Sequence, residues 1–148
     1  MRRELEELQQ RILTDIALAR HIDVGVESYT GNELVLAAPL AENSNHKGTA
    51  FGGSLFSLAV LSGWGLLVLK LAERGVEADI VIQDSRMMYR RPVTGDFRAR
   101  ATLPPLEEFD RLLHMLERRG RGRLELGASI EQDGVVAVDF LGTFAVVA

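Results

Sequence analysis

Sixteen consecutive residues without a charge, residues 54–69, constrain the fold of this chain more than any other feature. A helix that is apolar on all sides lies either in a membrane or in the core of a protein. A membrane span needs about 20 apolar residues. Here serine and glycine interrupt the run, and Lys70, Glu73 and Arg74 follow it directly. We therefore expect a buried central helix and no membrane span.

The segment before this helix is polar and rich in glycine, and it is the candidate site. If Gly52 and Gly53 open the helix, their N–H groups have no intrahelical partner. They also lie at the positive end of the helix dipole, where a carbonyl oxygen, an oxyanion or a phosphate is stabilised. The alternative interpretation is that the two glycines only allow tight packing between loop and helix. The polar side chains nearby are Asn45, His46, Thr49, Ser54 and Ser57.

The rest of the chain has the periodicity of strands and two further helical segments. Residues 4–19 have the apolar spacing of an amphipathic helix, and Gly31-Asn32 joins two short strand segments as a hairpin would. Residues 106–116 fit a helix or an irregular crossover. Many strands and a single core helix indicate an antiparallel α+β domain. The expected strands are residues 24–29, 33–39, 79–90, 96–103, 123–132 and 135–147.

Composition excludes several classes of function. With 148 residues the chain is expected to form one domain, and a net charge of −4 argues against nucleic-acid binding. The chain has no cysteine and no metal-ligand spacing, so we expect neither a metal nor another cofactor. The charged N-terminus lacks the apolar stretch of a signal peptide, which predicts a cytoplasmic protein.

Four short motifs together resemble a known family. They are Asn45-His46-Lys47-Gly48-Thr49, Phe51-Gly52-Gly53-Ser54-Leu55, Gly63-Trp64-Gly65, and Arg91-Pro92-Val93 with Gly95-Asp96. The set resembles the hot-dog fold superfamily of acyl-CoA thioesterases and dehydratases, and in particular the YiiD-type C-terminal thioesterase domain. The resemblance covers residues 22–148, with residues 1–21 as a preceding helix. It implies an antiparallel sheet wrapped around one long central helix, and a homodimer or larger oligomer that joins two sheets.

The activity implied by this resemblance is hydrolysis of an acyl-CoA or acyl carrier protein thioester. The expected catalytic groups are Asn45, His46, Gly52, Gly53, Ser54 and Ser57. Related thioesterases often carry a carboxylate two turns into the helix and a histidine before the glycine pair. Here these positions hold Val60 and Phe51, and residues 48–72 contain no acid. His46 is then a candidate general base near neutral pH, and a carboxylate from elsewhere, such as Asp84, is another.

Two alternatives stay open at this point. Asn45 and His46 can instead cap turns and bond the backbone. The protein can also be a non-catalytic acyl-thioester binding or regulatory module of the same fold. A dehydratase is a weaker third possibility, because its paired histidine and acid are missing.

Substrate-binding residues are expected at Thr49, Phe51, Trp64, Arg90 and Arg91. Ten of the seventeen basic residues are arginines between Arg86 and Arg123, a stretch that has only five acids. Guanidinium groups suit phosphate oxygens, so this stretch can attract CoA, with Arg90 and Arg91 the best candidates. A solvated, salt-bridged surface is the alternative. Trp64 can line an acyl tunnel or simply pack in the core.

Overall fold

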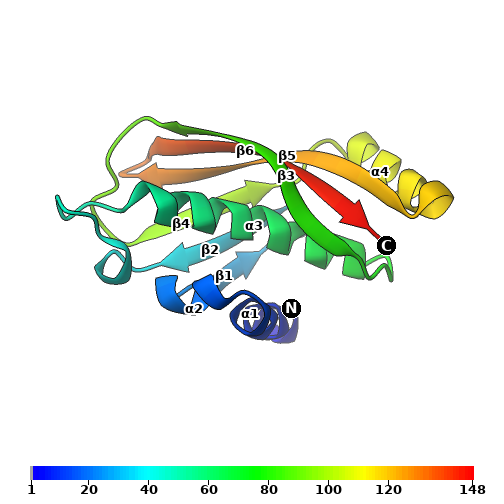
Figure 1. The fold of residues 1–148 in the computed structure, drawn as a ribbon, viewed down its shortest axis with the longest axis horizontal. Helices are drawn as coiled ribbons and strands as arrows, with labels where there is room; N and C mark the ends of the chain where they lie inside the picture. The colour runs from blue at the N-terminus through cyan, green and yellow to red at the C-terminus, as the bar shows by residue number, and fades with distance from the viewer. Residues whose placement is uncertain (1) are drawn as a thin grey trace.

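The computed structural model describes residues 2–148, and it confirms an α+β fold built around one long helix (Figure 1). One helix at the centre is surrounded by strands; two shorter helices come at the N-terminus, and a third lies between the fourth and fifth strands. The elements in chain order are α1 (Arg2–Asp15), α2 (Ala17–Ile22), β1 (Gly25–Tyr29), β2 (Glu33–Ala38), η1 (Ala41–Asn43), α3 (Gly52–Ala72), β3 (Asp79–Tyr89), β4 (Phe97–Thr102), α4 (Leu106–Arg119), β5 (Arg121–Gln132) and β6 (Val135–Val147).

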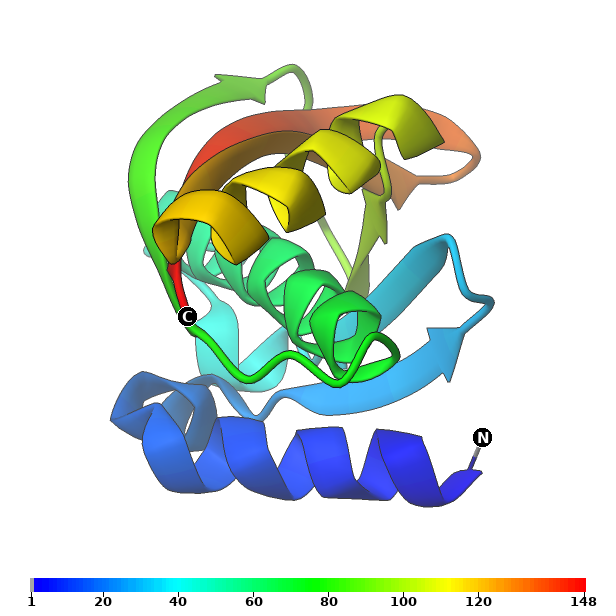
Figure 2. The ribbon, with the colours of Figure 1, turned by 90° about the vertical axis from the view of Figure 1, so that its right-hand side faces the viewer.

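The six strands form one antiparallel sheet in the order β1-β2-β4-β5-β6-β3. Figure 2 shows this sheet curling around α3, with β3 on one side of the helix and β1 and β2 on the other. The longest pairing, β5 with β6, turns at Asp133-Gly134, where both residues have positive φ. The order leaves β1 and β3 at the two edges, and α1 packs against β1.

Helix α3 is the core of the molecule. By length and composition alone its 21 residues could cross a membrane, but more than half of its most apolar stretch is buried inside the protein. Leu58, Leu66 and Leu67 are fully inaccessible to solvent and belong to the same hydrophobic cluster as residues of the sheet. The expectation of a buried core helix is therefore confirmed.

Two glycines let the sheet approach α3 closely from two directions. A Cβ atom at Gly63 would come within 2.8 Å of Phe144 and 2.9 Å of Leu126, on β6 and β5. A Cβ atom at Gly65 would come within 2.8 Å of Leu34 on β2. Since real Cβ atoms do not approach other heavy atoms so closely, both positions need glycine for the sheet to close around the helix.

The predicted N-terminal helix is confirmed, but a break at Ile16 divides the segment into α1 and α2. Ile16 adopts an extended conformation between them, and the Arg20 guanidinium donates to the carbonyl of Leu13 at the end of α1. The change of direction lets α2 bury Ala19 and Ile22. At residues 106–119 the chain forms a helix, α4, which ends at Gly120 with φ of +71°.

Candidate functional site

The loop between η1 and α3 is held as a small hairpin by its own polar groups. An isolated bridge pairs Ser44 with Ala50. Inside it, Asn45 Oδ1 accepts the N–H groups of Lys47 (2.8 Å) and Thr49 (3.1 Å), while its Nδ2 donates to Thr49 Oγ1 (2.8 Å). Gly48 turns the tip with φ of +78°. Asn45 and Thr49 thus bond each other and fix the shape of the loop.

Backbone contacts anchor the chain on both sides of this loop's junction with α3. The N–H of Ala50 donates to Val93 (2.8 Å), in the β3–β4 connection, and the N–H of Phe51 donates to the carbonyl of Asn43 (2.7 Å). The buried Asn43 amide in turn donates to the carbonyls of Ile22 and Pro39. The start of α3 is therefore tied to α2, β2 and the β3–β4 connection.

The first two N–H groups of α3 are available to a ligand. Phe51 precedes the helix, and its side chain has no oxygen that could cap the first N–H groups. The first internal hydrogen bonds run from the N–H groups of Ser54 and Leu55 to the Phe51 carbonyl, at 2.9 and 3.1 Å. Within residues 2–148, the N–H groups of Gly52 and Gly53 have no hydrogen-bond partner. The helix does begin at Gly52, and its two leading donors stand at the positive end of its dipole.

Aromatic side chains flank these two donors. The ring of Phe51 lies over Gly53, and the ring of Tyr89, at the end of β3, lies beside Gly52. Both aromatic residues are more than half exposed. Tyr89 Oη also donates to the carbonyl of Gly52 at 3.0 Å. Partial burial raises the pKa of Tyr89.

Sequence reasoning did not identify Tyr89 or Asn43 as part of this site. Tyr89 lies 37 positions beyond Gly52, and only the closure of the sheet around α3 brings the two together. The sequence feature that could have pointed to Tyr89 was the neighbouring Arg91-Pro92-Val93 motif, one of the motifs that resemble the family. Asn43 carried no signal of its own.

A hollow of about 280 Å³ opens beside Gly52, with Leu55, Tyr89 and Arg91 in its wall. Arg90 also lines it, but its Nε bonds Asp139 Oδ2 at 2.6 Å. In the part of the chain described by the structure, Arg91 has no ion pair. Both predicted arginines therefore line the hollow beside Gly52, and Arg91 has the freer guanidinium.

The remaining predicted polar residues differ in their surroundings. Ser57 Oγ donates to the carbonyl of Gly53 at 2.8 Å, a common bond for a helical serine. Ser54, one residue after the donors, is half-buried. His46 is exposed at the tip of the hairpin loop, and its side chain bonds no other residue between Arg2 and Ala148.

Trp64 is not near these residues. Twelve residues of helix, at about 1.5 Å each, separate it from Gly52 by about 18 Å. Its Nε1 donates to the carbonyl of Ile80 (3.2 Å), and the Arg11 guanidinium lies over its ring. The Trp64 side chain therefore connects α3 with α1 and β3.

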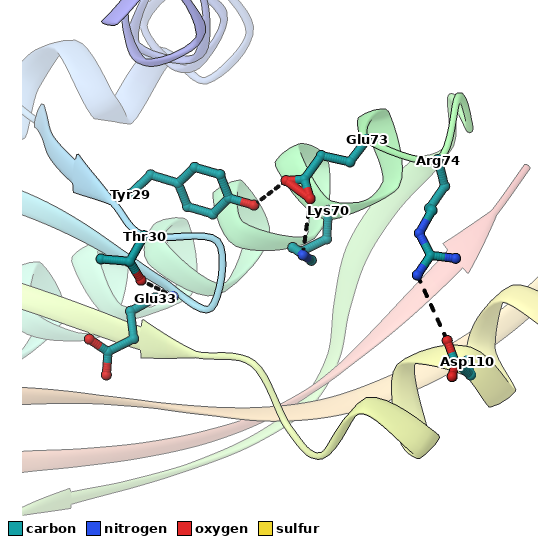
Figure 3. Close-up of polar contacts among 7 residues, drawn as sticks. All are labelled: Tyr29, Thr30, Glu33, Lys70, Glu73, Arg74 and Asp110. Carbon is teal, nitrogen blue, oxygen red and sulfur yellow. Dashed lines mark hydrogen bonds and ion pairs between the residues drawn. The ribbon is translucent and has the colours of Figure 1, made fainter. Parts of the chain in front are cut away.

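A separate polar cluster closes the far end of α3. Figure 3 shows Tyr29 of β1 pointing at Glu73, which also pairs with Lys70 at 3.0 Å. Burial by itself raises the pKa of Glu73, but hydrogen bonds from Tyr29 and Lys70 outweigh it and lower that pKa. Burial and the neighbouring carboxylate raise the pKa of Tyr29. This cluster ties the end of the core helix to the edge strand β1.

Comparisons with known proteins agree with this geometry. A protein of unknown function from Chlorobaculum tepidum TLS is 34% identical, with a TM-score of 0.91 over 96% of this chain and 93% of that one. A "putative thioesterase" from Shewanella oneidensis is 28% identical, with a TM-score of 0.90 over 100% of both chains. A "probable thioesterase" from Pseudomonas aeruginosa, 24% identical over 96% of this chain and 94% of that one, shares the fold with a TM-score of 0.81.

A six-stranded antiparallel sheet wrapped around one long helix defines a hot-dog fold, which this chain shares with the similar thioesterase structures. The model of the family "Putative thioesterase (yiiD_Cterm)" matches residues 5–148, nearly the whole chain. The chain therefore belongs to the yiiD C-terminal thioesterase family.

Proposed function

We propose that this protein hydrolyses an acyl thioester, with the thioester carbonyl bound at the start of α3. The observation that carries the proposal is the pair of unpartnered N–H groups of Gly52 and Gly53, in a chain of a thioesterase family. A tetrahedral intermediate places a full negative charge on the former carbonyl oxygen. Two preorganised donors at a helix N-terminus stabilise that charge more than the neutral carbonyl, and such donors often supply the largest single catalytic effect.

The reaction then needs water as the nucleophile. Water adds to the carbonyl carbon, the C–S bond breaks, and the products are a carboxylic acid and a free thiol. His46 is the imidazole of the site loop and is proposed as the general base. Asn45 is proposed to act on the reaction through the loop, because its amide bonds Lys47 and Thr49. Ser54 and Ser57 are proposed to complete the polar wall beside the donors.

Coenzyme A is the proposed carrier of the acyl group. The hollow beside Gly52 is lined by Arg91, whose guanidinium suits phosphate oxygens. The apolar faces of Phe51 and Tyr89 stand next to the donors and are proposed to contact the acyl chain. An acyl carrier protein also presents its thioester on a phosphorylated arm. Coenzyme A and the carrier protein therefore differ only in the part of the molecule beyond that arm.

A homodimer or larger oligomer is also proposed. Strand β3 is an edge strand of 11 residues, and a long unpaired edge offers its backbone groups to a second strand. Val81, Met88 and Tyr89 on this strand are exposed to solvent in the protomer. Light scattering should give at least twice the protomer mass at micromolar concentration; a stable monomer there would contradict the proposal.

The second candidate function is acyl-thioester binding without hydrolysis. It is favoured by one observation: no carboxylate occurs from Gly48 to Ala72, so α3 and the end of its preceding loop supply no acid. Val60 and Phe51 occupy places that are often polar in related folds. Such a protein would hold the carbonyl at the same donors and release it unchanged.

Thiol release distinguishes the two functions. Acyl-CoAs from short to long chain length are incubated with the protein, and free CoA is measured with a thiol reagent. Because the chain contains no cysteine, the protein gives no background signal. Turnover of any chain length supports the hydrolase. Binding of acyl-CoA by calorimetry with no CoA release across the panel supports the binding module.

A further inference from the structure

One peptide group links the site's second donor to Tyr89. The carbonyl of Gly52 and the N–H of Gly53 belong to the same peptide unit, which is planar and rigid. Tyr89 Oη donates to that carbonyl at 3.0 Å. A contact on the oxygen side therefore acts on the direction and the polarity of the N–H on the other side.

A hydrogen bond accepted by a peptide carbonyl strengthens the N–H of the same peptide as a donor. A donor at the carbonyl oxygen draws electron density toward it and makes the N–H a better donor, by about 10–30% per bond. A carbonyl inside an α-helix already accepts one N–H from the residue four positions on. The Tyr89 hydroxyl is thus a second donor on the Gly52 carbonyl, and it comes from outside the helix.

For the first donor, the N–H of Gly52, the helix backbone alone supplies the hydrogen bonds that strengthen it. The N–H of Gly52 shares its peptide unit with the carbonyl of Phe51, which accepts from both Ser54 (2.9 Å) and Leu55 (3.1 Å). Each unpartnered N–H therefore belongs to a peptide whose carbonyl has two donors. For the peptide between Gly52 and Gly53, the second donor is Tyr89.

The position of Tyr89 is fixed independently of α3. Tyr89 pairs with Val138 on β6, and the next residue, Arg90, donates its N–H to the carbonyl of Ala137 at 2.7 Å. The ring lies alongside the helix start, where a Cβ atom added to Gly52 would be in ordinary van der Waals contact with Tyr89 Cε1, at 3.5 Å. The pairing of β3 with β6 thus positions the Tyr89 hydroxyl at the Gly52 carbonyl.

We propose that Tyr89 is a positioning residue for the oxyanion site: its hydroxyl holds the peptide between Gly52 and Gly53 and strengthens Gly53 N–H as a donor. This inference rests on the proposed thioester hydrolysis for its kinetic consequence. Its structural part, the coupling of Tyr89 to the Gly53 amide, stands apart from any reaction.

The kinetic test compares Tyr89→Phe with Tyr29→Phe. Both substitutions remove one hydroxyl and keep the ring, but Tyr29 bonds Glu73 at the far end of α3. One oxyanion donor is worth about 10²–10³ in kcat, and a 10–30% loss of that effect corresponds to about two- to eightfold. Tyr89→Phe should lower kcat by that factor and leave KM within about twofold, because the neutral ground-state carbonyl gains little from the stronger donor. Tyr29→Phe should leave kcat unchanged.

The second readout needs no activity. In an NMR spectrum, Tyr89→Phe should move the amide proton of Gly53 upfield, more than that of Gly52, while the retained ring keeps ring-current effects nearly constant. Tyr29→Phe should move neither amide. A Gly53 amide that is unmoved in Tyr89→Phe overturns the proposal, and so does an unchanged kcat. If the wild-type protein hydrolyses no thioester but the Gly53 shift appears, the proposed function fails and the coupling stands.

Discussion

The ring of Phe51 lies so close over Gly53 that a Cβ atom added to this glycine would come within 2.5 Å of Phe51 Cε2. At Gly52, one residue earlier, the nearest atom to an added Cβ is Tyr89 Cε1 at 3.5 Å, an ordinary van der Waals contact. Neither glycine has a positive φ, so the backbone of both accepts other residues. The two neighbouring donors therefore differ in the room beside them.

This difference predicts unequal effects of alanine at the two positions. Gly53→Ala must displace the exposed ring of Phe51 and crowd the space beside the donors, so kcat for thioester hydrolysis should fall by about 10²-fold, the scale of a lost donor. Gly52→Ala should cost several times less. Melting temperatures of both variants should stay close to wild type, since the displaced ring can move into solvent. Equal losses of kcat in the two variants would mean that the contact between Phe51 and Gly53 does not affect the donors.

Arg91 is expected to contribute more to CoA binding than Arg90. The Arg90 guanidinium is already bonded to Asp139 at 2.6 Å, whereas Arg91 lines the hollow and has no ion pair among the described residues. Arg91→Ala should weaken CoA binding by about 1–3 kcal/mol, the range of a charge-assisted hydrogen bond. Titration calorimetry with CoA measures this directly. Arg90→Ala is the matched control and should change the affinity less; the reverse order would reject the assignment.

The sequence was sufficient for the architecture because the fold is dominated by hydrophobic pattern. The uncharged run predicted the core helix, and strict alternation predicted β4, whose residues are buried and exposed in turn. The break at Ile16 was not predictable, because neither glycine nor proline is present there and the periodicity continues across it. What divides α1 from α2 is the tertiary packing of Ala19 and Ile22.

Sequence reasoning named the contiguous part of the candidate site, together with Arg90 and Arg91, which line the hollow beside Gly52. Residues 45–54 are neighbours in sequence, and the helix-start argument placed the two donors correctly at the beginning of α3. The contributions of Tyr89 and Asn43 depend on sheet closure and loop path, which no local pattern encodes. For Trp64 the sequence left an acyl tunnel and core packing as alternatives; the glycines on either side of it allow close packing of the sheet on α3.

Gly63→Ala should destabilise the fold without touching the site. The added methyl group would lie within 3 Å of the rings and methyl groups of Phe144 and Leu126, both almost fully buried, so the core must shift to accept it. Such overpacking typically costs about 1–3 kcal/mol. Urea unfolding measures it, with Gly25→Ala as the control, because nothing lies within 4 Å of a Cβ atom there. Equal stabilities of the two variants would show that the core has unfilled space.

The cluster at the far end of α3 predicts a pH dependence of stability. Because the folded state lowers the pKa of Glu73 below its ordinary value of 4.5, the ionised form contributes stability above pH 4.5. That contribution is lost as the pH falls through 4.5 and below it. Glu73→Gln should therefore be less stable than wild type at pH 7, with the difference shrinking toward pH 3. Urea unfolding at several pH values checks this, and a difference that is constant with pH would contradict it.

His46 and Asn45 are expected to act differently, although they are adjacent. Asn45→Ala removes three hydrogen bonds that shape the loop, so it should increase protease cleavage or amide exchange at residues 44–50 as well as lower kcat.

His46 is exposed and bonds no other residue within the described chain, so His46→Ala should leave the loop's protection unchanged. If His46 is the general base, this variant should lose about 10²-fold or more in kcat. Full turnover in His46→Ala would mean that the base comes from another part of the assembly.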